Sequence, residues 1–156
     1  MTGGDKLAEK PGKRERDYLR DYCTAAFRFY ARWGGRKYFI DSIIMDMQKQ
    51  KGGGISSPTE FALVHKEAAL RDKAAELADL DAVDKVLQIC GRDIKRAVEI
   101  VYLDRPNEEL EWGDIKNRVH VAELTLPASE RQIYYWLKKA RMLFAEERGL
   151  RLKSLQ

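Results

Sequence analysis

The sequence feature that most constrains the fold is the segment from Pro127 to Gly149, which has the pattern of one helix with a marked beginning and end. Ser129 is a favourable N-cap, and Gln132 three residues later completes a capping box. Gly149 can adopt the left-handed conformation that ends many helices. One face of this helix is expected to be buried, because apolar residues recur at helical spacing at Ile133, Leu137, Ala140 and Phe144.

The opposite face of the same helix is rich in hydrogen-bond donors and cations. Its members are Arg131, Gln132, Tyr135, Lys138, Lys139 and Met142, with Arg141 at the edge. A helix with a basic solvent face suits the major groove of DNA, where first-turn side chains reach base edges and later lysines meet phosphates. A basic surface helix with no ligand is the alternative interpretation.

A shorter helix is predicted just upstream. Ile115, Val119 and Ala122 form an apolar stripe, so residues 113–123 are expected to make about three helical turns. Leu126 precedes Pro127 and is therefore expected to be extended. A short helix, a tight connection and a longer basic helix form a helix-turn-helix pattern. The connection lacks the glycine that often makes this turn.

Three stretches carry a resemblance to a known family. Residues 129–141, SERQIYYWLKKAR, resemble the recognition helix of region 4 of sigma factors, and residues 98–102, VEIVY, look like the preceding helix of that unit. Residues 141–150, RMLFAEERGL, are similar to the ending of small phage and prophage regulators of the ArpU/RinA type. The likeness extends over residues 93–150 and is weaker over 15–90.

This resemblance implies a sigma-region-4-like DNA-binding domain over residues 79–150, with residues 129–148 as its recognition helix. The segment that enters the major groove would begin at Ser129, and base contacts would come from Glu130, Arg131, Gln132 and Tyr135. Phosphate contacts would come from Lys138, Lys139 and Arg141, with Lys116 and Arg118 from the supporting helix. The implied partners are double-stranded DNA and RNA polymerase.

The N-terminal part is expected to be a helical region over residues 14–78 that follows a disordered tail, residues 1–13. A helix over residues 13–33 has a wide aromatic face, which favours burial in the core over stacking on unpaired bases. Its arginines, including Arg28, flank that face as candidate phosphate contacts or solvated charges. Gly34 and Gly35 interrupt the helix, and a second helix over residues 36–51 is expected to fold back as a hairpin.

A long helix is predicted to start at a second capping box, Ser57 to Glu60, and to continue past Leu77 with a bend near residues 79–81. Leu63, Leu70 and Leu77 are seven residues apart, which indicates either packing inside the chain or a coiled-coil homodimer. A short helix over residues 93–103 follows. Trp112 is expected to fill the junction before the next helix.

Composition limits the class of protein. Charged residues make up 35% of the 156 residues, and no apolar run approaches the roughly 20 residues that span a bilayer, so we expect a cytoplasmic protein. Residues 1–58 have 12 Lys and Arg against 7 Asp and Glu, a net charge of +5. Residues 59–126 have 10 against 15, which gives −5, and residues 127–156 have 7 against 3, which gives +4. Basic ends fit phosphate contacts, and residues 151–156 are expected to be a basic tail.

The sequence predicts no metal site, no cofactor and no enzymatic activity. Neither histidine has a Cys or His at ligand spacing, and the glycines at 52–54 lack the lysine of a phosphate-binding loop. The expectation is an all-α DNA-binding transcriptional regulator of phage or prophage type, with a homodimer possible. The alternatives are the small subunit of a phage terminase and an RNA polymerase-interacting module.

Overall fold

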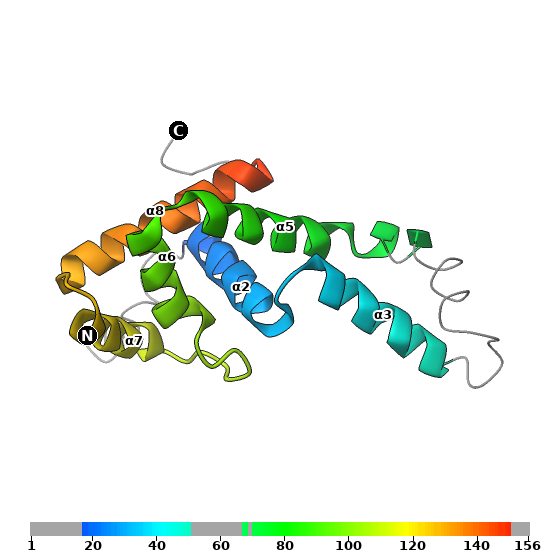
Figure 1. Ribbon diagram of the computed structural model, residues 1–156, viewed down its shortest axis with the longest axis horizontal. Coiled ribbons are helices and arrows are strands. Elements are labelled where there is room, and N and C mark those ends of the chain that lie inside the picture. The colour runs from blue at the N-terminus through cyan, green and yellow to red at the C-terminus, as the bar shows by residue number, and fades with distance from the viewer. Residues whose placement is uncertain (1–16, 51–66, 69, 151–156) are drawn as a thin grey trace, which may run out of the picture.

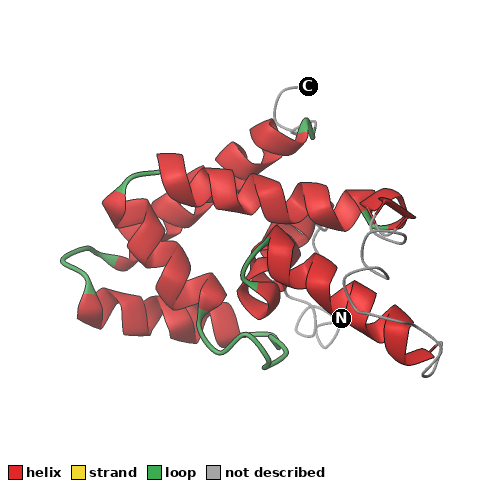
Figure 2. Cartoon of the chain, turned by 45° about the vertical axis from the view of Figure 1, so that its right-hand side comes forward, coloured by secondary structure: helices red, strands yellow, loops and turns green. Residues whose placement is uncertain are grey.

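The computed structural model describes residues 17–50, 67–68 and 70–150, and these residues are helical with no strand among them (Figures 1 and 2). The all-α prediction is therefore confirmed. The predicted tails at 1–13 and 151–156, the capping box at 57–60 and Leu63 lie outside the described residues. The helices are α2 (Tyr18–Trp33), α3 (Arg36–Gln50), α5 (Ala74–Ile89), α6 (Arg92–Val98), the π-helix η1 (Glu99–Leu103), α7 (Asp114–Thr125) and α8 (Glu130–Arg148).

Helix α2 packs inside the C-terminal bundle. It contacts α5, η1 and α8, and the ring of Phe27 lies 5.4 Å from that of Tyr102 and 5.8 Å from that of Phe144. Phe27 shares one hydrophobic cluster with buried residues of α5, α6, η1, α7 and α8. The boundary expected between residues 78 and 79 therefore does not separate two cores, because an N-terminal helix completes the C-terminal one.

Only part of the wide aromatic face of α2 is buried. Cys23, Ala26 and Phe27 are buried, whereas Tyr18 is 73% exposed. The part of the aromatic face around Phe27 is therefore buried, whereas its beginning at Tyr18 is exposed. The buried side of α2 is the one that packs against α5, η1 and α8.

Helix α3 does not fold back along α2 as the expected hairpin. It runs outward from the bundle, and its described contacts are with the end of α2 and with α5 (Figure 1). Phe39 makes edge contacts with Phe29 and Trp33 at this corner. Phe39, Ile40 and Ile44 form a second cluster with Leu77 and Leu80 of α5. Gly34 permits the sharp exit because its φ of 76° is unfavourable for other residues.

The predicted bend at residues 79–81 is absent. Helix α5 is continuous from Ala74 to Ile89, and the interruption falls earlier, at Lys73, which has φ −114° and ψ 28°. Leu77 is buried against α3. It therefore packs inside the chain, which is one of the two interpretations of the leucine spacing, the other being a coiled-coil homodimer. The predicted helix over residues 93–103 exists, but its second half, η1, is a π-helix.

Arg28 of α2 is a buried structural residue and not a phosphate contact. It is 6% exposed, and its guanidinium donates hydrogen bonds to the carbonyls of Tyr102, Asp104, Arg105 and Glu108. These carbonyls belong to the end of η1 and the loop after it. Burial lowers the pKa of Arg28, and the nearby charge of Arg118 lowers it further. The side chain stays charged because an arginine is not deprotonated near neutral pH.

A buried polar cluster joins α2, α5 and α8 on the other side of the bundle. Asp79 is 8% exposed, its Oδ1 lies 2.7 Å from Arg148 Nε, and it accepts a hydrogen bond from the Tyr22 hydroxyl. The Asp79 carboxylate is therefore buried and paired rather than solvated. Tyr22, Asp79 and Arg148 hydrogen-bond to one another where little water has access. The cluster therefore fixes the second half of α8.

We expect the substitution Arg28→Ala to lower the free energy of unfolding by about 3 kcal/mol, because it leaves buried carbonyls without donors. Arg32→Ala is the matched control, since Arg32 lies one turn later on the same helix and is exposed. The control should change stability by less than about 0.5 kcal/mol. Urea denaturation of both variants measures this, and equal effects would contradict the role of Arg28.

The two cysteines should differ in reactivity. Cys23 is 1% exposed, and burial raises the pKa of its thiol to about 11. This shift from 9.0 lowers the thiolate fraction about a hundredfold near neutral pH. Cys90 is only half-buried. Burial raises the pKa of the Cys90 thiol as well, so the supported contrast is one of order. In a thiol-reagent assay at pH 8 the native protein should react at Cys90 before Cys23, Cys90→Ser should remove that first phase, and Cys23 should react after unfolding.

Candidate nucleic-acid interface

The connection between α7 and α8 makes its turn without a glycine. Leu126 is extended, with ψ 149°, as expected before a proline. Its amide donates to the carbonyl of Ala122, and the amide of Ala128 donates back to the carbonyl of Leu126. These two hydrogen bonds hold the backbone between Thr125 and Ser129. The connection between α7 and α8 is therefore short.

Helix α8 begins and ends where its cap residues predict. The Ser129 side chain accepts a hydrogen bond of 3.2 Å from the amide of Gln132, and Gly149 closes the helix with φ 72°. The predicted apolar stripe is confirmed, because Ile133, Leu137, Ala140 and Phe144 are all at most 1% exposed. This burial fixes which face of α8 remains open to solvent.

The open face of α8 is cationic over its first ten residues. Arg131, Gln132 and Lys138 are exposed, and Tyr135 is 52% exposed. The ammonium of Lys139 lies 5.9 Å from the centre of the Tyr135 ring, so these two side chains stack on the helix surface. We call the residues Arg131, Gln132, Tyr135, Lys138 and Lys139 the cationic face.

The cationic face stops before the end of the helix. Met142 is only partly exposed and Ala145 is fully buried, because α2 and α5 cover the second half of α8. Arg148, near the end, is held in the ion pair with Asp79. The exposed residues of the second half include the acidic Glu146 and Glu147. The cationic surface is therefore limited to the first half of the helix.

Three of the predicted site residues are not part of this surface. Arg118 is 4% exposed and donates to the carbonyls of Val101 and Asp104, so it supports the loop from inside and is removed from the candidate phosphate contacts. Arg141 points away from the cationic face and donates to the Tyr102 hydroxyl. Glu130 is half-buried beside Tyr134. Of the α7 residues, Lys116 is exposed and stays a candidate.

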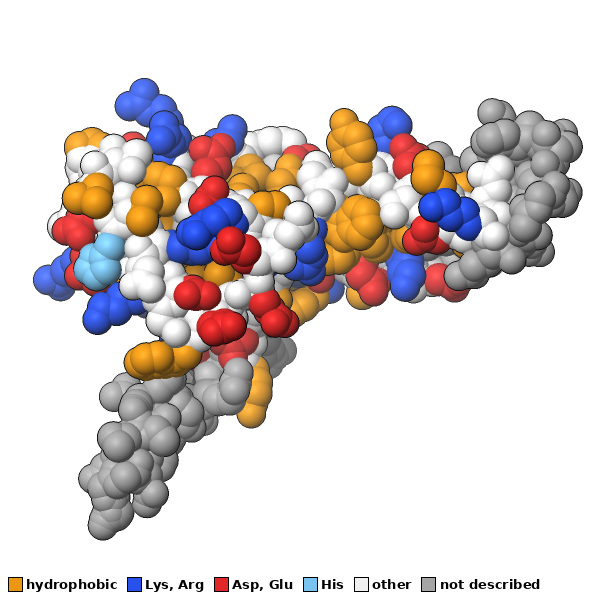
Figure 3. Space-filling model, turned by 90° about the horizontal axis from the view of Figure 1, so that it is seen from below, with side chains coloured by type: hydrophobic (Ala, Val, Ile, Leu, Met, Phe, Trp, Pro, Cys, Tyr) orange, Lys and Arg blue, Asp and Glu red, His pale blue; other side chains and the backbone are white. Residues whose placement is uncertain are grey.

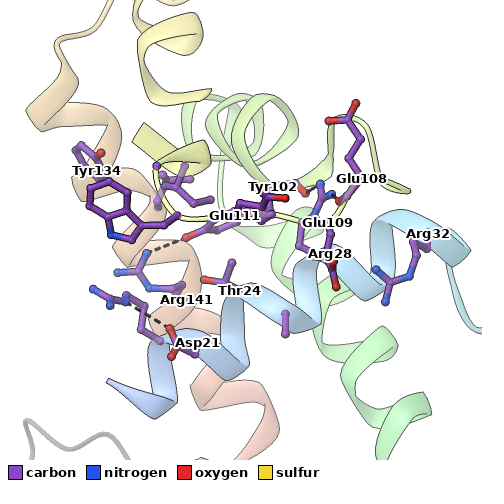
Figure 4. A pocket seen from close by; sticks show the side chains of 17 residues that line it. Asp21, Thr24, Arg28, Arg32, Tyr102, Glu108, Glu109, Glu111, Tyr134 and Arg141 are labelled. Atoms are coloured by element: carbon purple, nitrogen blue, oxygen red, sulfur yellow. Dashed lines mark hydrogen bonds and ion pairs between the residues drawn. The ribbon is translucent and has the colours of Figure 1, made fainter. Parts of the chain in front are cut away.

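A groove that the sequence did not reveal lies between α2, α8 and the loop before α7 (Figure 4). Its volume is about 590 Å3, and its wall includes Arg28, Arg141 and Tyr134. Trp112 lines the groove and is 78% exposed. The prediction that Trp112 fills the helix junction is therefore wrong, because the hydrogen bonds from Arg28 and Arg118 already hold the loop.

Comparison of the chain with protein-family models, with curated proteins and with solved structures found no match. The resemblance to sigma-factor region 4 and to ArpU/RinA-type regulators therefore stays an expectation from the quoted residues. None of the helices in the described part of the chain is long and apolar enough to cross a membrane. Among the same residues, no group of three His, Cys, Asp or Glu side chains is arranged to hold a metal ion.

We expect Ser129→Ala to lower the free energy of unfolding by about 1 kcal/mol, because the first turn of α8 loses its cap. Ser129→Asp should retain most of the parent's stability, since its carboxylate can accept the same hydrogen bond and is favoured near a helix N-terminus. Thermal and urea denaturation of both variants measure the difference. Equal stability of the alanine variant and the parent would show that this cap does not fix the helix start.

Proposed function

We propose that this protein is a sequence-specific DNA-binding transcriptional regulator that places the first half of α8 in the major groove. The observation that carries the proposal is the cationic face, which is exposed directly after the tight connection from α7. An α-helix fits the width of the major groove, and helix-turn-helix proteins read bases with the first residues of their second helix.

Different positions along α8 would make different contacts with DNA. Arg131, Gln132 and Tyr135 lie in the first two turns and can donate to base edges, where an arginine reads guanine and a glutamine reads adenine. Lys138 and Lys139 lie a turn later, where phosphates run past the helix. Lys116 of α7 adds a further cation. Arg118 and Arg141 take no part, because the fold uses their guanidinium groups internally.

The phage or prophage setting of this regulator rests on the resemblance to the ArpU/RinA type over residues 93–150, and RNA polymerase is the protein partner that the same resemblance favours. The folded geometry supports the DNA-binding part independently of that resemblance. An exposed row of cations on a helix whose other face is buried is the requirement for insertion into a groove.

The first test is selection of bound duplexes from a random pool by the purified chain. We expect a short enriched motif for the parent. For Arg131→Ala we expect information at one or two positions of that motif to disappear, because a base contact has been removed and the phosphate contacts stay. Selection that yields no motif for the parent would refute sequence-specific recognition.

The second test is the salt dependence of duplex binding. Lys138→Ala should weaken binding similarly for all sequences and reduce the slope of log K against log salt by about 1, since one phosphate contact is lost. Lys37→Ala is the control, because Lys37 is exposed on α3, away from α8 (Figure 1). If both lysine variants behave alike, the cationic face is not the DNA contact.

A further inference from the structure

The groove between α2, α8 and the loop before α7 has the size and the wall of a small-molecule site. Its volume of about 590 Å3 lies within the range of roughly 300–1,000 Å3 that is usual for ligand pockets. Tyr134 and Leu137 of α8 and Ile115 of α7 supply apolar surface to its wall. Such pockets take their specificity from a few polar groups, so the polar groups that lack a partner in the protein decide what the groove can bind.

The Tyr102 hydroxyl is one such group. Tyr102 lines the groove and is 2% exposed, and its hydroxyl oxygen accepts a hydrogen bond of 2.9 Å from Arg141 Nη1 (Figure 4). The hydroxyl proton has no acceptor in the described part of the chain. Because a hydroxyl donates as well as accepts, and a buried donor without an acceptor is destabilising, a ligand that brings an acceptor to this point gains a hydrogen bond.

Arg141 brings a positive charge to the same point. Its side chain is half-buried, and its guanidinium donates to a neutral group, the Tyr102 hydroxyl. No ion pair joins Arg141 to a carboxylate of residues 17–50, 67–68 or 70–150. Charges that are withdrawn from water are usually paired in proteins. Arg28 of the same wall differs, because carbonyl oxygens surround its guanidinium.

The total charge of the groove is nearly balanced, so burial decides which ion it prefers. Four arginines and four Asp or Glu side chains line it, and side chains of both signs are interspersed on the face of the molecule seen in Figure 3. Glu109 and Glu111 are exposed, so water screens their charges. Arg141 is half-buried and is screened less. An anion therefore gains most beside Arg141, while the two glutamates disfavour a ligand with several negative charges.

We propose that this groove binds a small organic acid that carries one carboxylate and an apolar or aromatic body. One carboxylate oxygen would accept the proton of the Tyr102 hydroxyl, and the other would accept from the remaining N–H groups of Arg141. The body of the acid would lie against Tyr134 and Ile115. A phosphate group is disfavoured, because its second negative charge would meet the nearby glutamates.

This site is separate from the cationic face of α8. Tyr102 belongs to η1, and Arg141 points away from the cationic face. The chain could therefore hold a small acid in the groove and a polyanion on the first half of α8. The inference does not depend on the proposed function, because it uses none of the residues assigned there to DNA.

The test is a titration of the 15N-labelled full-length chain with benzoate, phenylacetate and 3-phenylpropanoate, followed by amide chemical shifts. We expect at least one of these acids to bind with a Kd on the order of 1 mM, as is usual for ligands of this size. The shifted amides should belong to residues 109–115 and 134–141. The primary amides of the same acids are matched probes without charge, and they should bind about tenfold more weakly, since hydrogen bonds to charged groups are stronger.

Two substitutions remove the two polar groups. Arg141→Gln should weaken binding of the acid at least about tenfold and abolish the preference for the acid over its amide. Tyr102→Phe keeps the ring in the core and removes the hydroxyl, so it should weaken binding about fivefold. Arg32→Gln is the matched control, because Arg32 lines the same groove but is exposed. It should alter binding less than about twofold. The amide spectrum also reports whether each variant is folded.

Four outcomes would overturn the proposal. They are the absence of saturable binding by all three acids, equal affinity for the acids and their amides, an equal loss in Arg32→Gln, and unchanged affinity in folded Tyr102→Phe. If Arg141→Gln does not fold, the comparison of acid with amide and the Tyr102→Phe variant still decide. Lys138→Ala should bind the acid as the parent does, so failure of DNA recognition and failure of this proposal are distinguishable.

Discussion

The fold depends on one buried guanidinium. The π-helix η1 ends in carbonyls that have no partner within the helix, and Arg28 supplies donors to them from α2, more than seventy residues earlier in the chain. Arg118 of α7 also donates to the Asp104 carbonyl, and to that of Val101. Two like charges can lie close together here because carbonyl oxygens surround them and the Glu108 carboxylate is 3.9 Å from Arg118. Without Arg28 the end of η1 would need water in the core.

This arrangement explains why only part of α8 is free. The second half of α8 is fixed between α2 and α5 by the Phe144 contacts and by the ion pair of Arg148 with Asp79. The first half buries its apolar stripe in the core that also contains residues of α6 and α7. A helix clamped at one end and open at the other can present side chains to a large ligand without losing its own position. The N-terminal helix thus serves the C-terminal surface as a structural support.

The local features of the sequence predicted local structure well. Ser129 and Gly149 set the ends of α8, and the spacing of Ile133 and Leu137 identified its buried face, because caps and periodicity depend on near neighbours. The burial of Arg28 could not be predicted, since its acceptors are backbone carbonyls and any residue type supplies those. Trp112 was assigned to the interior because large aromatic residues are usually buried, and nothing near it in sequence shows that arginines already hold that loop. The candidate site was identified on α8, but its limit at Met142 depends on helices that pack there in three dimensions.

The shortness of the open half of α8 sets the length of DNA that one copy could read. Ten helical residues are about 15 Å long, and stacked base pairs are about 3.4 Å apart, so this face spans about four base pairs. A site that short recurs every few hundred base pairs by chance. Recognition of one unique site in a genome would therefore require two or more copies bound to neighbouring half-sites, or a second DNA-binding protein bound next to this one.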